Sequence, residues 1–344
     1  MSHAQNVKGR AMKAQFKMIA AALVMLFASA FVPATAQYNN FNPTKEAVQE
    51  EKLLQQLKQG DRLTGRISIP DEKAASLIQP QGQTWRDFHQ NKLPTIGGVV
   101  LLGMLGALVL FFLVRGRIKI DNGFSGQTIT RFASLDRFAH WMTAGCFIIL
   151  ALSGLNVSFG RMVILPLFGP ETFATISGYG KLAHNYLAFP FMAGVVLMFL
   201  LWVKDNIPNK IDMEWIKQGG GLFSKGQHPP AERFNAGQKV VFWIVIAGGA
   251  VMSVSGWFLL FPYTAPDGVA GLQLMTTVHA VLAVGFVAAM LAHAYIGSVG
   301  MEGAFDAMGT GEVDLNWAKE HHALWVEQEQ AKARSVPRNS VPAE

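Results

Sequence analysis

The feature that most constrains this chain is a pair of histidines inside an apolar stretch, residues 275–297, that is long enough to cross a bilayer. His279 and His293 are 14 residues apart, so on an α-helix they lie within about 40° of one face and about 21 Å apart along the axis. That separation fits inside a hydrocarbon core of about 30 Å, with one histidine near each edge. Because an imidazole is costly in a membrane, it usually marks a functional site. The two histidines therefore predict two stacked ligand positions, and haem fits them because its iron accepts neutral imidazole.

The composition agrees with a protein that crosses the membrane several times. Of the 344 residues, 51% are apolar and only 15% are charged, which is more typical of a polytopic membrane protein than of a soluble one. The net charge of +6 is spread over the loops, without the basic block that would indicate nucleic-acid binding. The single cysteine, Cys146, excludes a disulfide framework and a thiolate metal cluster. Any metal would therefore be bound by histidine or carboxylate.

The first 36 residues have the pattern of a cleavable secretory signal peptide. Four basic residues precede an apolar run over residues 18–32, and Ala34-Thr35-Ala36 is a small-residue pattern that signal peptidase accepts. The alternative is an uncleaved anchor helix, but a run of 15 residues is short for a membrane span of about 20 residues. Cleavage before Gln37 would leave a polar arm, residues 37–93, in the periplasm.

Five apolar segments of the mature chain predict its topology. The first, residues 94–114, is followed at once by three basic residues, so the positive-inside rule places its C-terminal end in the cytoplasm. We therefore expect an all-α membrane protein of the bacterial inner membrane, with a four-helix bundle over residues 130–300 and one extra N-terminal transmembrane helix. A cytoplasmic tail, residues 301–344, would follow. The spans of the bundle are predicted at residues 138–158, 180–203, 240–261 and 275–297.

This topology gives each membrane histidine a depth. His140 and His293 fall on the cytoplasmic side, whereas His184 and His279 fall on the periplasmic side. Each pair could hold one haem iron between two imidazoles, which would place one haem in each leaflet. The remaining histidines lie outside the spans and carry no such indication: His3, His89, His228, His321 and His322.

Other interpretations of these histidines remain open at this stage. A single membrane histidine is more often an interhelical hydrogen-bonding group than a ligand, but four in two depth-matched pairs favour two haems. Structural hydrogen bonding or a path for a divalent metal is the alternative. A transporter is disfavoured because the five spans contain no aspartate or glutamate to accompany the histidines.

Three further residues could help to hold a large planar ligand. Gly154 lies 14 residues after His140 on the same helical face, where a small residue lets such a group approach. Arg137 and Lys181 each precede a candidate ligand by three residues, within reach of a haem propionate. The alternative for each is a cation that extends from the end of a span toward water.

Three motifs resemble the gamma, cytochrome b subunit of respiratory formate dehydrogenase. They are Asp136-Arg137-Phe-Ala-His140-Trp141, Arg233-Phe-Asn235-Ala-Gly237-Gln238-Lys239 and Trp317-Ala-Lys-Glu-His321-His322. The resemblance covers about residues 130–329, and its most specific part is the stretch 235–239. The histidine spacing alone is shared with cytochrome b subunits of nickel–iron hydrogenase and thiosulfate reductase.

The resemblance implies two b-type haems, one on His140 and His293 and one on His184 and His279. It also implies quinone as electron acceptor, bound near Asn235, Gly237 and Gln238 beside His293. Asn235 could instead only cap a helix. The implied partners are an iron–sulfur beta subunit and a molybdenum or tungsten alpha subunit that carries out the substrate oxidation. The signal, the arm and the extra span depart from this family pattern.

We therefore interpret the chain as an electron-transfer subunit of an oxidoreductase complex, without catalytic residues for the substrate oxidation itself. It would anchor the complex and pass electrons from the periplasm to quinone. A cytochrome b subunit of a nickel–iron hydrogenase or thiosulfate reductase is the alternative within this class. A haem-free transporter or structural anchor is the alternative outside it.

Overall fold

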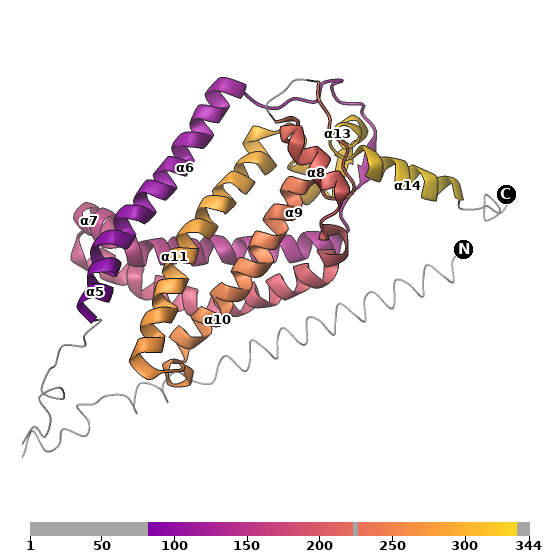
Figure 1. The fold of residues 1–344 in the computed structure, drawn as a ribbon. Coiled ribbons are helices and arrows are strands. Elements are labelled where there is room, and N and C mark those ends of the chain that lie inside the picture. Colours follow the sequence, from indigo (N-terminus) through magenta and orange to yellow (C-terminus); the bar gives the residue numbers. More distant parts are fainter. Residues whose placement is uncertain (1–81, 223–225, 336–344) are drawn as a thin grey trace, which may run out of the picture. The chain divides into compact units, whose positions relative to one another are not determined.

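The computed structural model describes residues 82–222 and 226–335 (Figure 1). The predicted signal peptide, residues 1–36, lies outside the described residues, as does most of the predicted arm. The chain forms two units. The first described helix, α5 (Gly82–Asp87), belongs to one unit, and all elements from Phe88 onward belong to the other. The following paragraphs concern this second unit, which begins with the short π-helix η1 (Phe88–Lys92).

Helices dominate the second unit, and the apolar ones are long enough to cross a membrane. The helix α6 (Leu93–Arg115) covers the predicted extra span and begins with Pro94 in its first turn, where the missing N–H of proline has no cost. Next come α7 (Ser134–Trp202), the nearly continuous pair α9 (Ala236–Trp243) and α10 (Gly249–Leu260), and α11 (Gly268–Tyr295). The π-helix η4 (Ile244–Gly248) joins α9 to α10.

The long helix α7 reverses direction at Gly169, whose φ of 78° favours glycine. Its two arms lie antiparallel: the indole of Trp202 donates to Asp136 over 2.6 Å, and Phe147 faces Phe191. Each arm contains one predicted span, residues 138–158 or 180–203. The residues between these spans are helical up to the turn, so the arms are longer than the predicted spans.

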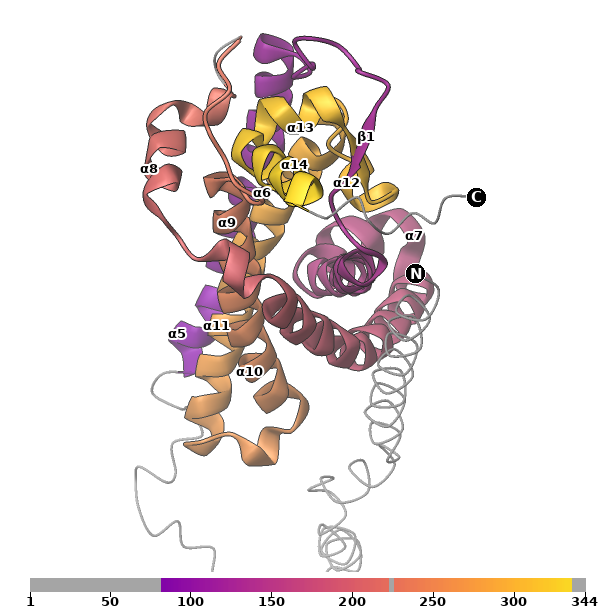
Figure 2. The same cartoon turned by 90° about the vertical axis from the view of Figure 1, so that its right-hand side faces the viewer.

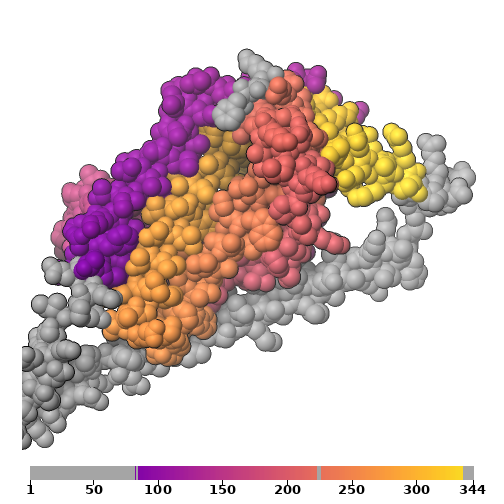
Figure 3. All heavy atoms as spheres, viewed as in Figure 1, coloured from indigo at the N-terminus to yellow at the C-terminus, as the bar shows by residue number. Residues whose placement is uncertain are grey.

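The remaining apolar helices pack beside one another. The 3-10 turn η5 (Pro262–Thr264) joins α10 to α11, which pack together, and α6 packs against the other side of α11 (Figure 3). A Cβ on Gly97 of α6 would lie 3.2 Å from Val284 of α11, which shows how closely these helices approach. Large apolar side chains point away from the bundle, and Leu102, Leu113 and Val157 are 71–84% exposed. Such a surface suits lipid.

Polar segments cover the end of the bundle where α7 begins and α11 ends (Figure 2). We call these segments, residues 116–133, 203–222, 226–235 and 301–335, the polar cap. Within it, β1 (Thr128–Thr130) pairs antiparallel with β2 (Glu312–Asp314). The other elements of the polar cap are η2 (Val203–Asn206), α8 (Lys210–Lys217), η3 (Gly219–Gly221), α12 (Asp306–Gly309), α13 (Leu315–His321) and α14 (Ala323–Ser335). The π-helix η6 (Ile296–Gly300) joins α11 to the polar cap.

The region that we had considered only as a tail, residues 301–344, is folded over its described part. Trp317 and Val326 are 3% and 2% exposed. The indole of Trp141 in α7 donates to the carbonyl oxygen of Met308 over 2.8 Å, and Ile118 and Met301 form a parallel bridge. The polar cap therefore ties the chain between α6 and α7 to the chain that follows α11.

Candidate functional site

The four membrane histidines form two pairs across helix interfaces. In the first pair, His140 on the first arm of α7 faces His293 on α11, and the ring centroids are 6.2 Å apart. In the second pair, His184 on the second arm of α7 faces His279 on α11, also at 6.2 Å. The structure thus brings together the residues that the sequence analysis had paired by depth.

The spacing within each pair suits one metal ion held between two imidazoles. When a metal lies about 2 Å from a nitrogen of each ring, the two ring centroids are about 6 Å apart. Both pairs have this spacing, and their interplanar angles are 59° and 62°. No group of three or more histidine, cysteine or carboxylate side chains in the described residues could hold a metal ion. The two histidine pairs are therefore the candidate metal sites of the described residues.

Two serines, which the sequence analysis missed, fix the orientation of the second pair. Ser153 Oγ lies 2.8 Å from His184 Nδ1, and Ser255 Oγ lies 2.9 Å from His279 Nδ1. Each hydroxyl donates its own hydrogen to a backbone carbonyl four residues earlier, so its oxygen accepts from the imidazole. The proton is therefore on Nδ1, which leaves Nε2 of each histidine as a metal ligand.

A glycine follows each of these serines and lies against the same histidine. A Cβ on Gly154 would come within 3.7 Å of His184 Cε1, and one on Gly256 within 3.3 Å of His279 Cε1. The repeated Ser-Gly dipeptide is thus the sequence signal that could have identified both serines. The first pair lacks this arrangement, because His140 Nδ1 is buried without a hydrogen-bond partner among the described residues.

Three phenylalanines separate the two pairs. Phe147, Phe191 and Phe286 each lie seven residues from a paired histidine, and Phe286 is midway between His279 and His293. Their ring centroids are 4.9–6.5 Å apart. Seven residues of helix correspond to about 10 Å, so an aromatic layer fills the bundle between the two candidate sites.

The first pair opens into a large cavity that extends into the polar cap. This cavity has a volume of about 870 Å³. His140 and His293 line it, together with the predicted quinone residues Asn235, Gly237 and Gln238. The cavity wall also includes Arg131, Trp215, His228 and His321 from the cap. The structure thus places the residues around Asn235 beside the first pair, as the sequence analysis had expected.

Asn235 is also the N-cap of α9. Its side-chain oxygen accepts from Gln238 N over 2.9 Å, and Gln238 Oε1 accepts from Asn235 N over 3.1 Å. This capping box stabilises the start of the helix. The N-cap interaction of α9 uses only the oxygen of the Asn235 side chain, so the amide nitrogen of Asn235 can still donate into the cavity. The capping interpretation is therefore confirmed, and it does not exclude a binding role.

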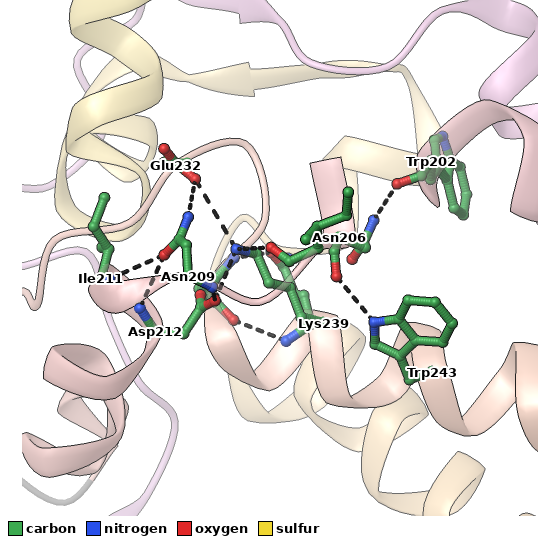
Figure 4. A network of polar contacts seen from close by, with 11 residues as sticks. Trp202, Asn206, Asn209, Ile211, Asp212, Glu232, Lys239 and Trp243 are labelled. Carbon is green, nitrogen blue, oxygen red and sulfur yellow. Dashed lines mark hydrogen bonds and ion pairs between the residues drawn. The ribbon is translucent and has the colours of Figure 1, made fainter. Parts of the chain in front are cut away.

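A buried ion pair holds this helix start against α8. Lys239, 4% exposed, donates to Asp212 Oδ2 over 2.9 Å and to the carbonyl oxygen of Ile207 over 3.2 Å (Figure 4). Asn209 caps α8 and donates to Glu232 over 2.7 Å. These contacts join α8, α9 and the chain before Asn235 into one network.

The network also positions Trp215, an aromatic wall of the cavity. A Cβ on Gly237 would lie 3.0 Å from the Trp215 ring, which explains why the residue after Ala236 is a glycine. The family resemblance placed Gly237 in the quinone region, and the structure shows that its missing side chain leaves room for the indole of Trp215.

The two cations predicted to reach a propionate lie in different surroundings. Arg137 Nη1 donates to the carbonyl oxygen of Thr310 in the polar cap over 2.5 Å. Lys181 is exposed, one turn before His184. Neither lines the cavity.

A buried cluster around Arg131 and His322 was also missed. Arg131, 3% exposed, donates from Nη2 to the Arg233 carbonyl oxygen over 2.6 Å and to His322 Nε2 over 2.9 Å. His322 Nδ1 donates to the Glu232 carbonyl oxygen. Burial lowers the pKa of His322 well below its usual value, and the neighbouring guanidinium lowers it further. The motif that ends in His321-His322 is thus part of the cavity wall and its support.

Comparisons with known proteins give the family. Residues 131–311, more than half of the chain, match the family described as prokaryotic cytochrome b561. The cytochrome b556 subunit of the nitrate-inducible formate dehydrogenase of Escherichia coli is 31% identical over 217 residues, which cover 61% of this chain and 96% of that protein.

Two further relatives have the same kind of name. A second Escherichia coli protein, the cytochrome b556(fdo) subunit of formate dehydrogenase, is 29% identical over 58% of this chain and 92% of its own length. The formate dehydrogenase cytochrome b556 subunit of Haemophilus influenzae is 24% identical over 62% of this chain and 87% of its own length.

Proposed function

The chain belongs to the prokaryotic cytochrome b561 family, and from this premise we propose that it is the membrane cytochrome b subunit of a formate dehydrogenase complex. It binds two b-type haems and passes electrons from an iron–sulfur subunit on the periplasmic side to quinone. The observation that carries this proposal is the presence of two histidine pairs, each with ring centroids 6.2 Å apart.

His140 and His293 bind one haem iron in this proposal, and His184 and His279 bind the other. Bound haem supplies one-electron chemistry, since its iron alternates between the ferric and ferrous states. Ser153 and Ser255 hold the second pair in the tautomer that presents Nε2. Gly154 and Gly256 leave room beside its imidazoles. Arg137 and Lys181 remain candidate partners for propionates.

The quinone site lies in the cavity beside His293 and the start of α9. Asn235, through its amide nitrogen, and the backbone N–H of Gly237 in the first turn of α9 supply hydrogen-bond donors for a quinone carbonyl, and Gln238 lines the same site. Trp215 supplies an apolar wall. The cavity continues past His228, which is 32% exposed and 3.1 Å from Asp121. Protons can therefore come from the polar side of the membrane, which the basic residues after α6 indicate to be the cytoplasm.

The orientation of the chain in the membrane also follows from the basic residues after α6. The polar cap faces the cytoplasm, and the residue 37–93 arm faces the periplasm after cleavage of residues 1–36. On the periplasmic side, the iron–sulfur beta subunit receives electrons from a molybdenum or tungsten alpha subunit. The mass of the mature chain tests cleavage, because a chain that begins at Gln37 lacks the peptides of residues 18–36.

The haem assignment is tested by histidine variants of the purified complex. We expect His140→Ala and His293→Ala to remove the same component of the visible spectrum, and His184→Ala and His279→Ala to remove the other. Haem content should fall from about two per chain toward one, since each pair binds one iron. If the two substitutions within one pair affect different components, the assignment is wrong. If the chain contains no haem, a transporter or anchor is favoured.

The quinone site is tested by Asn235→Ala in the same complex. Donor-driven haem reduction should continue, whereas quinone reduction and the binding of quinone-analogue inhibitors should be lost. Asn235→Asp keeps the helix cap but removes the amide donor, so it separates the two roles of the residue. Quinone reduction at the wild-type rate in both variants would place the site elsewhere. Co-purification of a nickel–iron subunit would favour the hydrogenase alternative.

A further inference from the structure

Arg131 is a buried cation without a carboxylate partner. The residue is 3% exposed, and neither Nε nor Nη1 of its guanidinium has a hydrogen-bond partner among the described residues. Nη2 uses only a carbonyl oxygen and a neutral imidazole. Burying a charge in this way is unfavourable unless the charge is paired. The residue therefore has three N–H donors available for an anion, two on Nη1 and one on Nε.

The surroundings of Arg131 increase its need for an anionic partner. Its guanidinium carbon lies 5.0–5.6 Å from the ring centroids of Phe132, Trp317 and Trp325. These rings hold the planar group in place but cannot neutralise its charge. Burial and, to a smaller extent, the nearby Arg233 lower the pKa of Arg131 to about 9, and no carboxylate of the described residues raises it. Arg233 differs because it is already paired with Asp205 at 2.7 Å.

Arg131 lines the same cavity as His140 and His293. It lies three residues before α7 begins at Ser134, and His140 lies six residues after that start. Six residues of helix rise by about 9 Å, a distance comparable to the radius of a haem with its side chains. A carboxylate attached to a group held by the first pair could therefore reach Arg131 through the cavity.

We propose that Arg131 binds a propionate carboxylate of the haem held by His140 and His293. This inference rests on the proposed function, since it requires a haem at the first pair. A charge-assisted N–H···O bond from Nη1 or from Nε to the carboxylate supplies the missing partner. The site is distinct from Arg137, whose Nη1 is bonded to the carbonyl oxygen of Thr310. Arg131 acts as a positioning residue that orients the haem and adds positive charge beside it.

The test uses the complete complex with haem whose propionate carbons carry carbon-13, observed by infrared difference spectroscopy on reduction. Labelled carboxylate bands of the first-pair haem should shift in Arg131→Gln and, to a smaller extent, in Arg131→Lys. In Arg131→Gln, the midpoint potential of the spectral component that His140→Ala removes should fall, because the variant lacks a positive charge that favours the reduced form of the iron. The second component should keep its bands and its potential.

Arg131→Lys keeps the buried charge, so it remains informative if Arg131→Gln does not fold. Arg233→Gln is the matched control, since it removes a neighbouring guanidinium that already has carboxylate partners, and it should leave the labelled bands unchanged. Unchanged labelled bands in Arg131→Lys would overturn the inference. So would an effect of Arg131→Lys on quinone-analogue binding alone, because the anion would then belong to the quinone pocket. Failure of the proposed function is distinguishable, since His140→Ala would then remove no haem.

Discussion

Single polar side chains make the two histidine pairs different from each other. His184 and His279 each donate from Nδ1 to a serine hydroxyl, whereas Nδ1 of His140 has no hydrogen-bond partner among the described residues. A hydrogen bond at Nδ1 makes the imidazole a stronger electron donor to a metal at Nε2. The second pair should therefore stabilise ferric iron more than the first.

Ser255→Ala should raise the midpoint potential of the haem at the second pair. The loss of a hydrogen bond worth about 0.5–1.5 kcal/mol corresponds to a shift on the order of 20–60 mV for one electron. Redox titration of the purified complex measures this shift. Ser253→Ala is the matched control, because Ser253 also donates to a carbonyl four residues earlier but, within the described part of the chain, is hydrogen-bonded to no histidine. An equal shift in both variants would contradict the role of Ser255.

Contacts between elements of the polar cap set the position of the cavity and stabilise its walls. The helices α8 and α9 meet through the buried Lys239–Asp212 pair, and this contact sets the position of Asn235 and Trp215. The histidine pairs could be predicted from the sequence because spacing and topology determine their depth, and the region around Asn235 was indicated by the family resemblance. The cap could not, because β1 pairs with β2 across more than 180 residues, and periodicity within one segment does not reveal such contacts.

Lys239→Met should destabilise the cap by about 3–5 kcal/mol, because it leaves the carboxylate of Asp212 buried without its partner. The double variant Lys239→Met/Asp212→Leu should recover part of this loss, since neither charge then remains. Chemical unfolding, followed together with quinone-analogue binding, measures both effects. If the double variant is as unstable as the sum of the two single variants, the pair is not coupled.

His321, the last residue of α13, and His322, which follows it as the C-cap, should make the polar cap sensitive to acid. Burial lowers the pKa of His321 to about 4, and His322 Nε2 accepts from Arg131. Because both folded-state pKa values lie below the unfolded value of about 6.5, the unfolded state binds more protons as the pH falls. Stability is therefore complete above about pH 6.5 and decreases toward pH 4.

Hydrogen exchange of residues 315–335 at pH 7, 5.5 and 4.5, corrected for intrinsic rates, measures this effect. Protection should decrease with each step, while α10 and α11 stay protected. His322→Gln should reduce the dependence on pH, because it removes one of the two titrating groups and keeps a donor and an acceptor. Equal protection at all three pH values would show that the two histidines do not control the cap.

On the scale of the whole molecule, the environments of the two pairs would give electron flow between the proposed haems a direction. The serine hydrogen bonds should lower the midpoint potential of a haem at the second pair, and the buried guanidinium of Arg131 should raise the midpoint potential of a haem at the first pair, beside the cavity. We therefore expect the haem at His140 and His293 to have the higher midpoint potential. Electrons that enter at the second pair then move downhill in free energy through the layer of Phe147, Phe191 and Phe286 toward quinone. Redox titration of His184→Ala and His140→Ala assigns the two potentials, and a higher value at the second pair would contradict this direction.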